Sequence, residues 1–172
     1  MGRVGIALRG CDRICVNDVE FSSSLDGVDW AALQATLAAD QFDNGRTPQE
    51  YRRSHERSHA VVFGRCNGRF VANGRILSDG VCNAYLVDIW TASTHRRHGI
   101  GREVVTRLLA TVPGQHVALF TDDMPAFYTA LGFRPQHGGM HHPAAETGPL
   151  TQRGAMSGRL PAVEVASSEL RV

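Results

Sequence analysis

The sequence contains no lysine, and its 18 basic residues are all arginines. Aspartate and glutamate together number 17, so the formal net charge is only +1. Nucleic-acid-binding and membrane-surface proteins usually carry a clear basic excess, so bulk charge favours neither class. A basic charge made of arginine is as typical of a GC-rich genome as of any function. Any anion site in this protein must therefore be local.

Long apolar runs are absent too. No stretch approaches the ~20 apolar residues of a membrane-spanning helix. The first residues also lack the apolar core of a secretory signal. We therefore expect a cytoplasmic protein without a membrane partner.

Cysteines are few, and they form no Cys-x-x-Cys pair. The four are Cys11, Cys15, Cys66 and Cys82. In a cytosolic chain such thiols stay reduced, so buried or incidental cysteines are expected. A histidine group near the end of the sequence lacks carboxylate or cysteine partners at fixed spacing: His137, His141 and His142. We therefore expect no metal site.

At 172 residues, with 42% hydrophobic content, the chain is large enough for one domain with a sizeable core. The most informative stretch begins at residues 85–90, an apolar run with the β-branched and aromatic content of a buried strand. A basic loop with two glycines follows, and from Glu103 apolar residues recur at helical spacing. The predicted order is strand, glycine loop, helix.

The glycine loop is suited to binding an anion. Gly99 and Gly101 have no side chain to block the backbone N–H groups, and the helix dipole adds partial positive charge at the same place. Actual or potential positive charge surrounds them, from Arg96, Arg97, His98 and Arg102. The loop is neither a Walker A loop nor a dinucleotide-binding Gly-x-Gly-x-x-Gly loop. It predicts a phosphate site, with a solvated basic loop as the alternative.

Two motifs together carry a family resemblance. The first is Arg96-x-x-Gly99-x-Gly101. The second is Phe127-Tyr128-x-x-x-Gly132-Phe133, in a helix predicted over residues 125–133 that follows a strand predicted over residues 116–121. With both motifs at this distance, the sequence resembles the GNAT superfamily of acetyl-CoA-dependent N-acetyltransferases, over residues 28–140.

The resemblance implies an α/β (α+β) fold, with a central mixed, mostly antiparallel and splayed sheet flanked by about four helices. Residues 1–142 would form the acyltransferase domain. Residues 143–172, rich in Gly, Pro, Ala, Ser and Thr, would be a tail that is either disordered or supplies the last strand from residues 161–166. Residues 134–140 are expected to form an antiparallel strand.

Two predicted helices before residue 85 have clear local signals. Residues 28–39 form a predicted helix with Asp26 or Asp29 as its N-cap. Residues 47–56 form a second, with a capping box and a proline at the first helical position.

The strands are predicted from turn chemistry. Cys66-Asn-Gly68 is a typical hairpin turn between strands at residues 59–63 and 69–72, the second of which continues to Leu77. Residues 13–17 are a candidate first strand, and residues 21–24 are expected to be a loop.

Acetyl-CoA is the acyl donor that the resemblance implies. Its pyrophosphate would lie on the loop residues Arg96, Arg97, His98, Gly99, Ile100, Gly101 and Arg102. Backbone groups at the end of the preceding strand would hold the pantetheine arm and polarise the thioester carbonyl, at Ile89, Trp90 and Thr91. Phe127 would pack against the pantetheine. The family's usual Val-x-Pro is replaced by Thr91-Ala-Ser93, which predicts a less rigid strand end.

Acetyl transfer to an amine requires a neutral amine and a proton for the departing thiolate. The resemblance places the phenol of Tyr128 near the CoA sulfur as general acid; the alternative is a core aromatic. Asp88 matches an acidic position of amine-acetylating members, where a carboxylate receives the ammonium proton; the alternative is a structural partner for an arginine. A strand bulge near this point, common in the family, would reverse the face on which Asp88 lies.

Acceptor recognition in the family comes from the loop between the first two helices and from the tail. Candidates are Asp43, Asn44, Tyr51 and Tyr85. The expected acceptor is an amine of a small molecule or of a protein, which attacks directly in a ternary complex. A homodimer is also compatible with the family.

Two other functions stay open. One is a transferase that uses aminoacyl-tRNA as acyl donor or acceptor, for which Arg52, Arg53 and Arg57 give slight support. The other is a non-catalytic CoA-binding module, against which the retention of Tyr128 argues.

Overall fold

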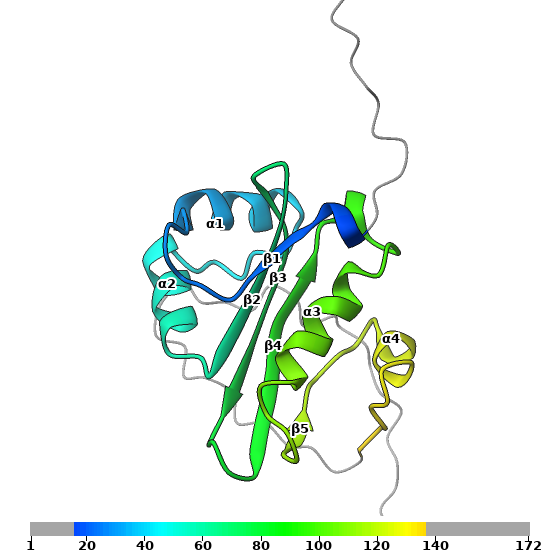
Figure 1. Cartoon of the computed structure of the whole chain (residues 1–172). Helices are drawn as coiled ribbons and strands as arrows, with labels where there is room; N and C mark the ends of the chain where they lie inside the picture. The colour runs from blue at the N-terminus through cyan, green and yellow to red at the C-terminus, as the bar shows by residue number, and fades with distance from the viewer. Residues whose placement is uncertain (1–15, 137–172) are drawn as a thin grey trace, which may run out of the picture.

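The computed structural model describes residues 16–136. Its centre is one five-stranded sheet in the order β1-β2-β3-β4-β5 (Figure 1). The strands are Glu20–Ser22 (β1), Ala60–Cys66 (β2), Arg69–Ser78 (β3), Asn83–Thr91 (β4) and His116–Ala118 (β5). Neighbouring strands are antiparallel, except that β4 and β5 are parallel. The mixed, mostly antiparallel sheet is confirmed.

Helices cover both faces of this sheet. Within the described range they are the α-helices Trp30–Ala39 (α1), Pro48–Glu56 (α2), Ile100–Leu109 (α3) and Pro125–Thr129 (α4), and the short 3₁₀ turns Val16–Asp18 (η1) and Ser93–His95 (η2). α1 and α2 lie together on one face, and α3 packs across β2, β3 and β4 on the other (Figure 1). The predicted fold class is confirmed.

The two faces have different cores. Under α1 and α2 the core is largely aromatic and contains Leu33, Leu37, Tyr51, Val61, Phe63, Phe70 and Trp90. Under α3 the core is aliphatic, with Ile76, Leu86, Val104, Val105 and Leu108 among its buried side chains. Burial of these side chains supplies the main driving force that fixes the helices on the sheet.

Local sequence signals account for several element boundaries. Asp29 caps α1, since its carboxylate accepts a hydrogen bond from the N–H of Ala32 at 2.9 Å. Thr47 and Glu50 form both hydrogen bonds of the capping box that begins α2. Asn67 and Gly68 have φ of 50° and 75°, the left-handed pair that a two-residue hairpin turn requires. These predictions are confirmed.

β4 contains a bulge opposite Gly74. Asn73 pairs with Trp90 but Arg75 pairs with Val87, so β4 has one more residue than β3 across this step. Asp88 lies in the extra segment with a φ of 54°. The bulge reverses strand parity, because Leu86 belongs to the aliphatic core and Trp90 to the aromatic one.

Other boundaries differ from the sequence predictions. In the described part of the predicted strand at residues 13–17, η1 begins instead of a strand, and the first described strand, β1, overlaps the start of the segment expected to be a loop. Phe21 explains the difference: it packs against the aliphatic core and pairs with Gly64 of β2. Residues 134–136 have no regular structure, and residues 137–140, the boundary at residue 142 and the tail lie outside the described residues.

The last two predicted elements are also shorter than expected. β5 ends at Ala118 because the chain then diverges from β4. α4 ends at Thr129, and the chain turns through Gly132, whose φ is 92°. The N–H of Phe133 donates to the carbonyl of Tyr128 at 3.1 Å, which closes this turn.

Candidate active site

β4 and β5 run side by side only at their start. Their pairing covers residues 83–85 of β4 and all of β5. β4 continues to Thr91, so beyond Tyr85 one of its edges has no strand neighbour in the described part of the chain. A cleft of about 400 Å³ lies at this divergence, lined by Phe42, residues 85–89, residues 119–124 and Tyr128. The splayed sheet that the resemblance implies is therefore present.

The glycine loop lies at the far end of β4, before α3. Arg97 and Gly99 have left-handed backbone conformations, with φ of 64° and 83°. Left-handed residues in a turn direct neighbouring N–H groups into one concavity that suits an anion. The N–H groups of residues 97–102 have no hydrogen-bond acceptor among the described residues. N–H groups without acceptors, together with the dipole of α3, are suited to an anionic ligand.

Gly101 keeps the start of α3 close to its neighbours. A Cβ at this position would lie 3.2 Å from Oγ1 of Thr91 and 3.5 Å from Cζ of Phe127. The side chain of Ile100 is 1% exposed and packs in the aliphatic core, so only its backbone faces the loop. Exposed side chains around the N–H groups include the guanidinium groups of Arg97 and Arg102 and the ring of His98.

Asp40, at the end of α1, ties the loop to the other face of the sheet. Its carboxylate accepts hydrogen bonds from Nε1 of Trp90 at 2.8 Å and from the N–H of Ser93 at 3.1 Å. It also pairs with the guanidinium of Arg96 at 3.2 Å, which in turn donates to the carbonyl of Thr91 at 3.1 Å. Burial alone would raise the pKa of Asp40, but these donors outweigh it and the pKa is lowered.

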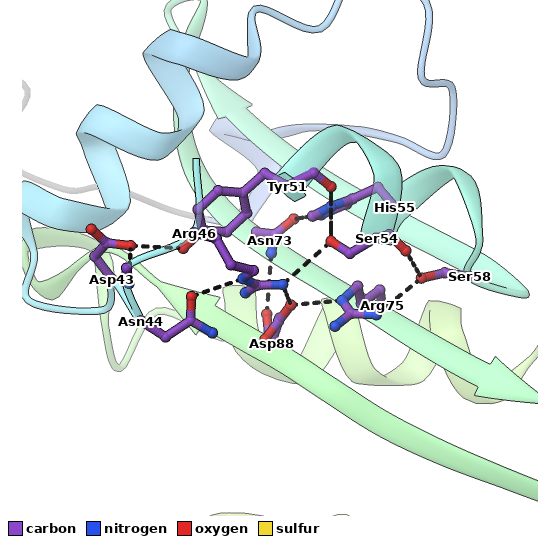
Figure 2. A network of polar contacts seen from close by, with 11 residues as sticks. Asp43, Asn44, Arg46, Tyr51, Ser54, His55, Ser58, Asn73, Arg75 and Asp88 are labelled. Atoms are coloured by element: carbon purple, nitrogen blue, oxygen red, sulfur yellow. Dashed lines mark hydrogen bonds and ion pairs between the residues drawn. The ribbon is translucent and has the colours of Figure 1, made fainter. Parts of the chain in front are cut away.

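Asp88 joins two arginines in a polar network between β4, β3 and the segment that precedes α2 (Figure 2). Its Oδ2 lies 2.8 Å from NH1 of Arg46 and 2.6 Å from Nε of Arg75. Burial tends to raise the pKa of Asp88, but the hydrogen bond from Arg46 and the charges of both arginines lower it overall. The structure therefore favours the interpretation of Asp88 as an arginine partner over that of a base.

Further hydrogen bonds extend this network towards α2 (Figure 2). Asn73 accepts at Oδ1 from Nε2 of His55, 3.0 Å away, and donates to the carbonyl of Asp88 at 3.2 Å. His55 is 1% exposed, and its Nδ1 lies 2.8 Å from the carbonyl of Tyr51. Burial lowers the pKa of His55. The bulge of β4 is thus held by side chains from α2 and β3.

A family model described as the acetyltransferase (GNAT) family matches residues 28–133. This chain belongs to that family. The match covers the glycine loop, the cleft and α4, so the predicted family is confirmed.

Individual GNAT relatives agree with this assignment. A curated rice protein, serotonin N-acetyltransferase 2, chloroplastic, is 33% identical over 118 residues, which is 64% of this chain and 58% of that protein. The chain thus spans less than two thirds of that relative's length. A provisionally assigned acetyltransferase of Deinococcus radiodurans R1 is 26% identical, with a TM-score of 0.66 over 76% of this chain and 92% of that one.

One further solved structure supports the fold alone. Glucosamine-6-phosphate N-acetyltransferase of Arabidopsis thaliana is 16% identical, with a TM-score of 0.59 over 72% of this chain and 97% of that chain. Among residues 16–136, no group of histidine, cysteine and carboxylate side chains could hold a metal ion. No helix there is long and apolar enough to cross a membrane.

Tyr128 of the GNAT motif lies where the cleft meets a second hollow of about 890 Å³ beside β5 and α4, and it lines both. Its ring makes edge-on contacts with Phe127 and Phe133, at centroid distances of 5.0 and 5.7 Å. Its hydroxyl has no protein partner in residues 16–136 and is not a buried atom there, so it reaches solvent. Burial of the ring raises the pKa of Tyr128.

The four predicted acceptor residues divide into two groups. Tyr85 lines the cleft and contacts Phe120 edge-on at 5.8 Å. Tyr51 has no exposed surface, so its prediction as an acceptor contact is wrong; it packs in the aromatic core instead. Asp43 and Asn44 do not line the cleft, and their carboxylate and amide oxygens accept hydrogen bonds from the α1–α2 segment itself.

Sequence analysis missed several residues of this site. Asp40, Arg46 and Arg75 have no motif, because their partners are distant in the sequence. The apolar residues of the cleft were missed too, although three of them are among the few exposed large hydrophobics: Phe42, Phe120 and Met124, at 37%, 73% and 53% exposed. The sequence offered a signal only for Phe120, an aromatic residue near the end of the strand predicted over residues 116–121.

Proposed function

We propose that this chain transfers an acetyl group from acetyl-CoA to a primary amine, by direct attack in a ternary complex. The observation that carries the proposal is the row of unpaired N–H groups at residues 97–102, which lies beside a strand whose free edge leads into the cleft. Acetyl-CoA fits these features, because its pyrophosphate needs N–H donors and its pantetheine arm can pair with a strand edge.

Different residues of the chain would bind different parts of acetyl-CoA. The loop N–H groups, with Arg97 and Arg102, would bind the pyrophosphate, while Arg96 remains held by Asp40. Backbone groups of residues 89–91 would hold the pantetheine and polarise the thioester carbonyl. Acetyl-CoA supplies the activated acyl group for the reaction.

Tyr128 would donate the proton that the departing thiolate needs. Its position at the junction of the two hollows places it beside the free edge of β4. The raised pKa of its phenol keeps it protonated near neutral pH, as a proton donor requires. A cysteine-like thiolate, with a pKa of about 8.5, is a suitable acceptor for a proton from a phenol.

The cleft favours an amine with an aromatic or apolar body. Its wall presents Phe42, Tyr85, Phe120 and Met124, and its rim carries Asp122 and Asp123. Exposed apolar side chains gathered in one cleft indicate a binding site, and the rim carboxylates would attract a cationic amine. The name of the curated rice relative, a serotonin N-acetyltransferase, points to the same class of acceptor.

The transfer to tRNA receives no such support. Arg52 pairs with Glu56 of its own helix at 2.7 Å. Arg53 and Arg57 are exposed and have no ion pair among the described residues, but two arginines are few for the continuous basic surface that tRNA binding needs. We therefore keep the small amine as the proposed acceptor.

Thiol release from acetyl-CoA, measured across an amine panel, tests the proposal. The panel contains 2-phenylethylamine, tryptamine, spermidine, L-lysine and glucosamine 6-phosphate. We expect the two arylalkylamines to have the highest kcat/KM, and Phe120→Ala to raise their KM without changing that of spermidine. Equal rates for all amines would contradict the proposed acceptor class, and no release with any amine would contradict the transferase function.

A further inference from the structure

The two carboxylate oxygens of Asp88 are in different situations. Oδ2 accepts from both Arg46 and Arg75 (Figure 2), whereas Oδ1 has no partner in the described part of the chain. No buried side-chain oxygen there lacks a partner, so Oδ1 is accessible. Asp88 also lines the cleft between β4 and β5. The carboxylate is therefore held by both arginines through one oxygen, and its other oxygen is accessible in a residue that lines the cleft.

Three elements hold this orientation. Asp88 lies in the β4 bulge with a left-handed φ of 54°, a conformation that persists in a non-glycine residue only when its surroundings fix it. Arg46 comes from the segment between α1 and α2, and Arg75 from β3. Arg46 is fixed further by Asn44 and Ser54, and Arg75 by Ser58. The guanidinium groups are thus themselves held in place.

The charges around Asp88 decide what its free oxygen can do. Two guanidinium groups face one carboxylate, so the cluster carries one net positive charge. Other titratable groups near it are Tyr51, His55 and Tyr85, and across the cleft Asp122, Asp123 and Tyr128. Burial lowers the pKa of His55, whose ring nitrogens lie against the oxygens of Tyr51 and Asn73. An ammonium ion beside Oδ1 is therefore stabilised less than it would be by an isolated carboxylate.

We propose that Arg46 and Arg75 are positioning residues for the acceptor amine, which aim Oδ1 of Asp88 at an amine N–H and restrict it to accepting a hydrogen bond. This inference rests on the proposed acetyl transfer. The amine lone pair forms the C–N bond, and the C–S bond breaks with its electron pair on sulfur. Tyr128 gives its proton to that sulfur, and the proton lost by the amine passes to water and restores the phenol. Asp88 remains ionised throughout.

The test compares two clamp variants, Arg46→Gln and Arg75→Gln, with Arg52→Gln as the control. Arg52→Gln removes the same charge from a side chain on α2 that is 63% exposed. The readouts are the KM for 2-phenylethylamine and the pH dependence of kcat/KM. In the wild type, log kcat/KM should rise with unit slope on the acid side, because only the amine loses a proton. In the clamp variants the pKa of Asp88 rises, so the slope should steepen towards two.

We expect the KM of the clamp variants to rise by about tenfold or more, since a displaced contact group costs rate steeply. Arg75→Lys separates charge from geometry: it should restore the unit slope but not the KM, because lysine lacks the planar fork that reaches both Asp88 and Ser58. A merely structural role would lower stability without changing the slope.

If the clamp variants fold and show the same pH slope of kcat/KM and the same KM as Arg52→Gln, the inference is wrong. The proposed acetyl transfer would still stand, provided that the wild type turns over. If the clamp variants fail to fold, the ¹³Cγ resonance of Asp88 in the wild type decides. Added to the CoA complex, 2-phenylethylamine should shift that resonance, and an unmoved resonance at saturating amine would overturn the inference. A wild type with no acetyl transfer to any amine would overturn the proposed function and the inference with it.

Discussion

The two ends of β4 contrast in how their polar groups are satisfied. Around the bulge, Asp88, Arg46, Arg75, Asn73 and His55 bind one another in one connected network (Figure 2), in which Oδ1 of Asp88 has no partner among the described residues. At the glycine loop, the N–H groups of residues 97–102 have no acceptor among the described residues. A connected hydrogen-bond network rigidifies the strand, whereas N–H groups without an acceptor are available to bind an anion. Under the proposed function, the bulge end of β4 would be the acceptor side, and the open loop end would be the acetyl-CoA side.

Asp40 links the two sides. It belongs to α1, on the aromatic face, yet its carboxylate binds the N–H of Ser93 and the guanidinium of Arg96 at the loop. The difference between the two ends of β4 implies that substitutions near the bulge should act on the acceptor, and substitutions in the loop on acetyl-CoA. Four variants can break or sharpen this separation.

Tyr128→Phe should have the largest effect. The change keeps the ring contacts with Phe127 and Phe133 but deletes the proton donor, so turnover should fall by about 10²-fold or more, the usual contribution of one positioned acid. Stability and CoA affinity should hardly change. Steady-state kinetics across pH provide the measurement, and full wild-type activity would show that the thiolate leaves unassisted.

Arg96→Ala combined with Gly99→Val should weaken CoA binding by about an order of magnitude or more, because valine at a φ of 83° distorts the N–H row and the lost guanidinium frees the loop. Gly114→Val is the control, since Gly114 also has a positive φ, 77°, with open space around it and lies beyond α3. Calorimetric titration with CoA compares them. Equal affinity in the loop variant and the control would remove this loop from the site.

Asp40→Asn tests the link between the two sides. The loss of charge-assisted hydrogen bonds should destabilise the protein by about 1.5–3 kcal/mol near neutral pH. Because the folded pKa of Asp40 is lowered, its contribution is complete above the ordinary aspartate pKa of about 3.9. That contribution disappears as the pH falls through the folded value. Thermal melts from pH 7 downwards should therefore show the wild type and variant converging, and a constant gap would contradict the linkage.

Thr47→Ala should have the smallest effect. It removes the N-cap of α2, whose hydroxyl accepts from the N–H of Glu50 at 3.3 Å. Loss of such a cap costs about 1 kcal/mol, which lowers the Tm by about 2–4 °C in a protein of this size. The acceptor KM should rise slightly while CoA affinity is unchanged. A larger change in CoA affinity than in acceptor KM would contradict the proposal that the acceptor and acetyl-CoA bind at different ends of β4.

The open side of β4 could be predicted from the sequence because its signals are local. Glycines at positions 99 and 101 and the helix that follows them lie within a few residues of each other. The same holds for the capping box of α2 and for the Asn67-Gly68 turn. These features depend on residues that are close in the sequence, so they could be predicted without any tertiary contact.

The bulge network and the link through Asp40 could not be predicted, because their contacts join distant residues. Asp40 and Arg96 are 56 positions apart, and Arg75 and Asp88 are 13 apart on separate strands. A sequence pattern also cannot show on which face a bulged residue lies, which left open whether Asp88 faces an arginine or a substrate. Tyr51 illustrates the same limit: its place near the acceptor loop suggested contact, yet it packs into the core.

The most direct test of the central claim is acetyl transfer by the purified protein, with acetyl-CoA and 2-phenylethylamine, followed by mass spectrometry of the amine together with free-thiol release. The account predicts N-acetylated amine and free CoA in equal amounts, with both abolished when acetyl-CoA is omitted. Thiol release without acetylated amine, or no release although calorimetry shows bound acetyl-CoA, would contradict it.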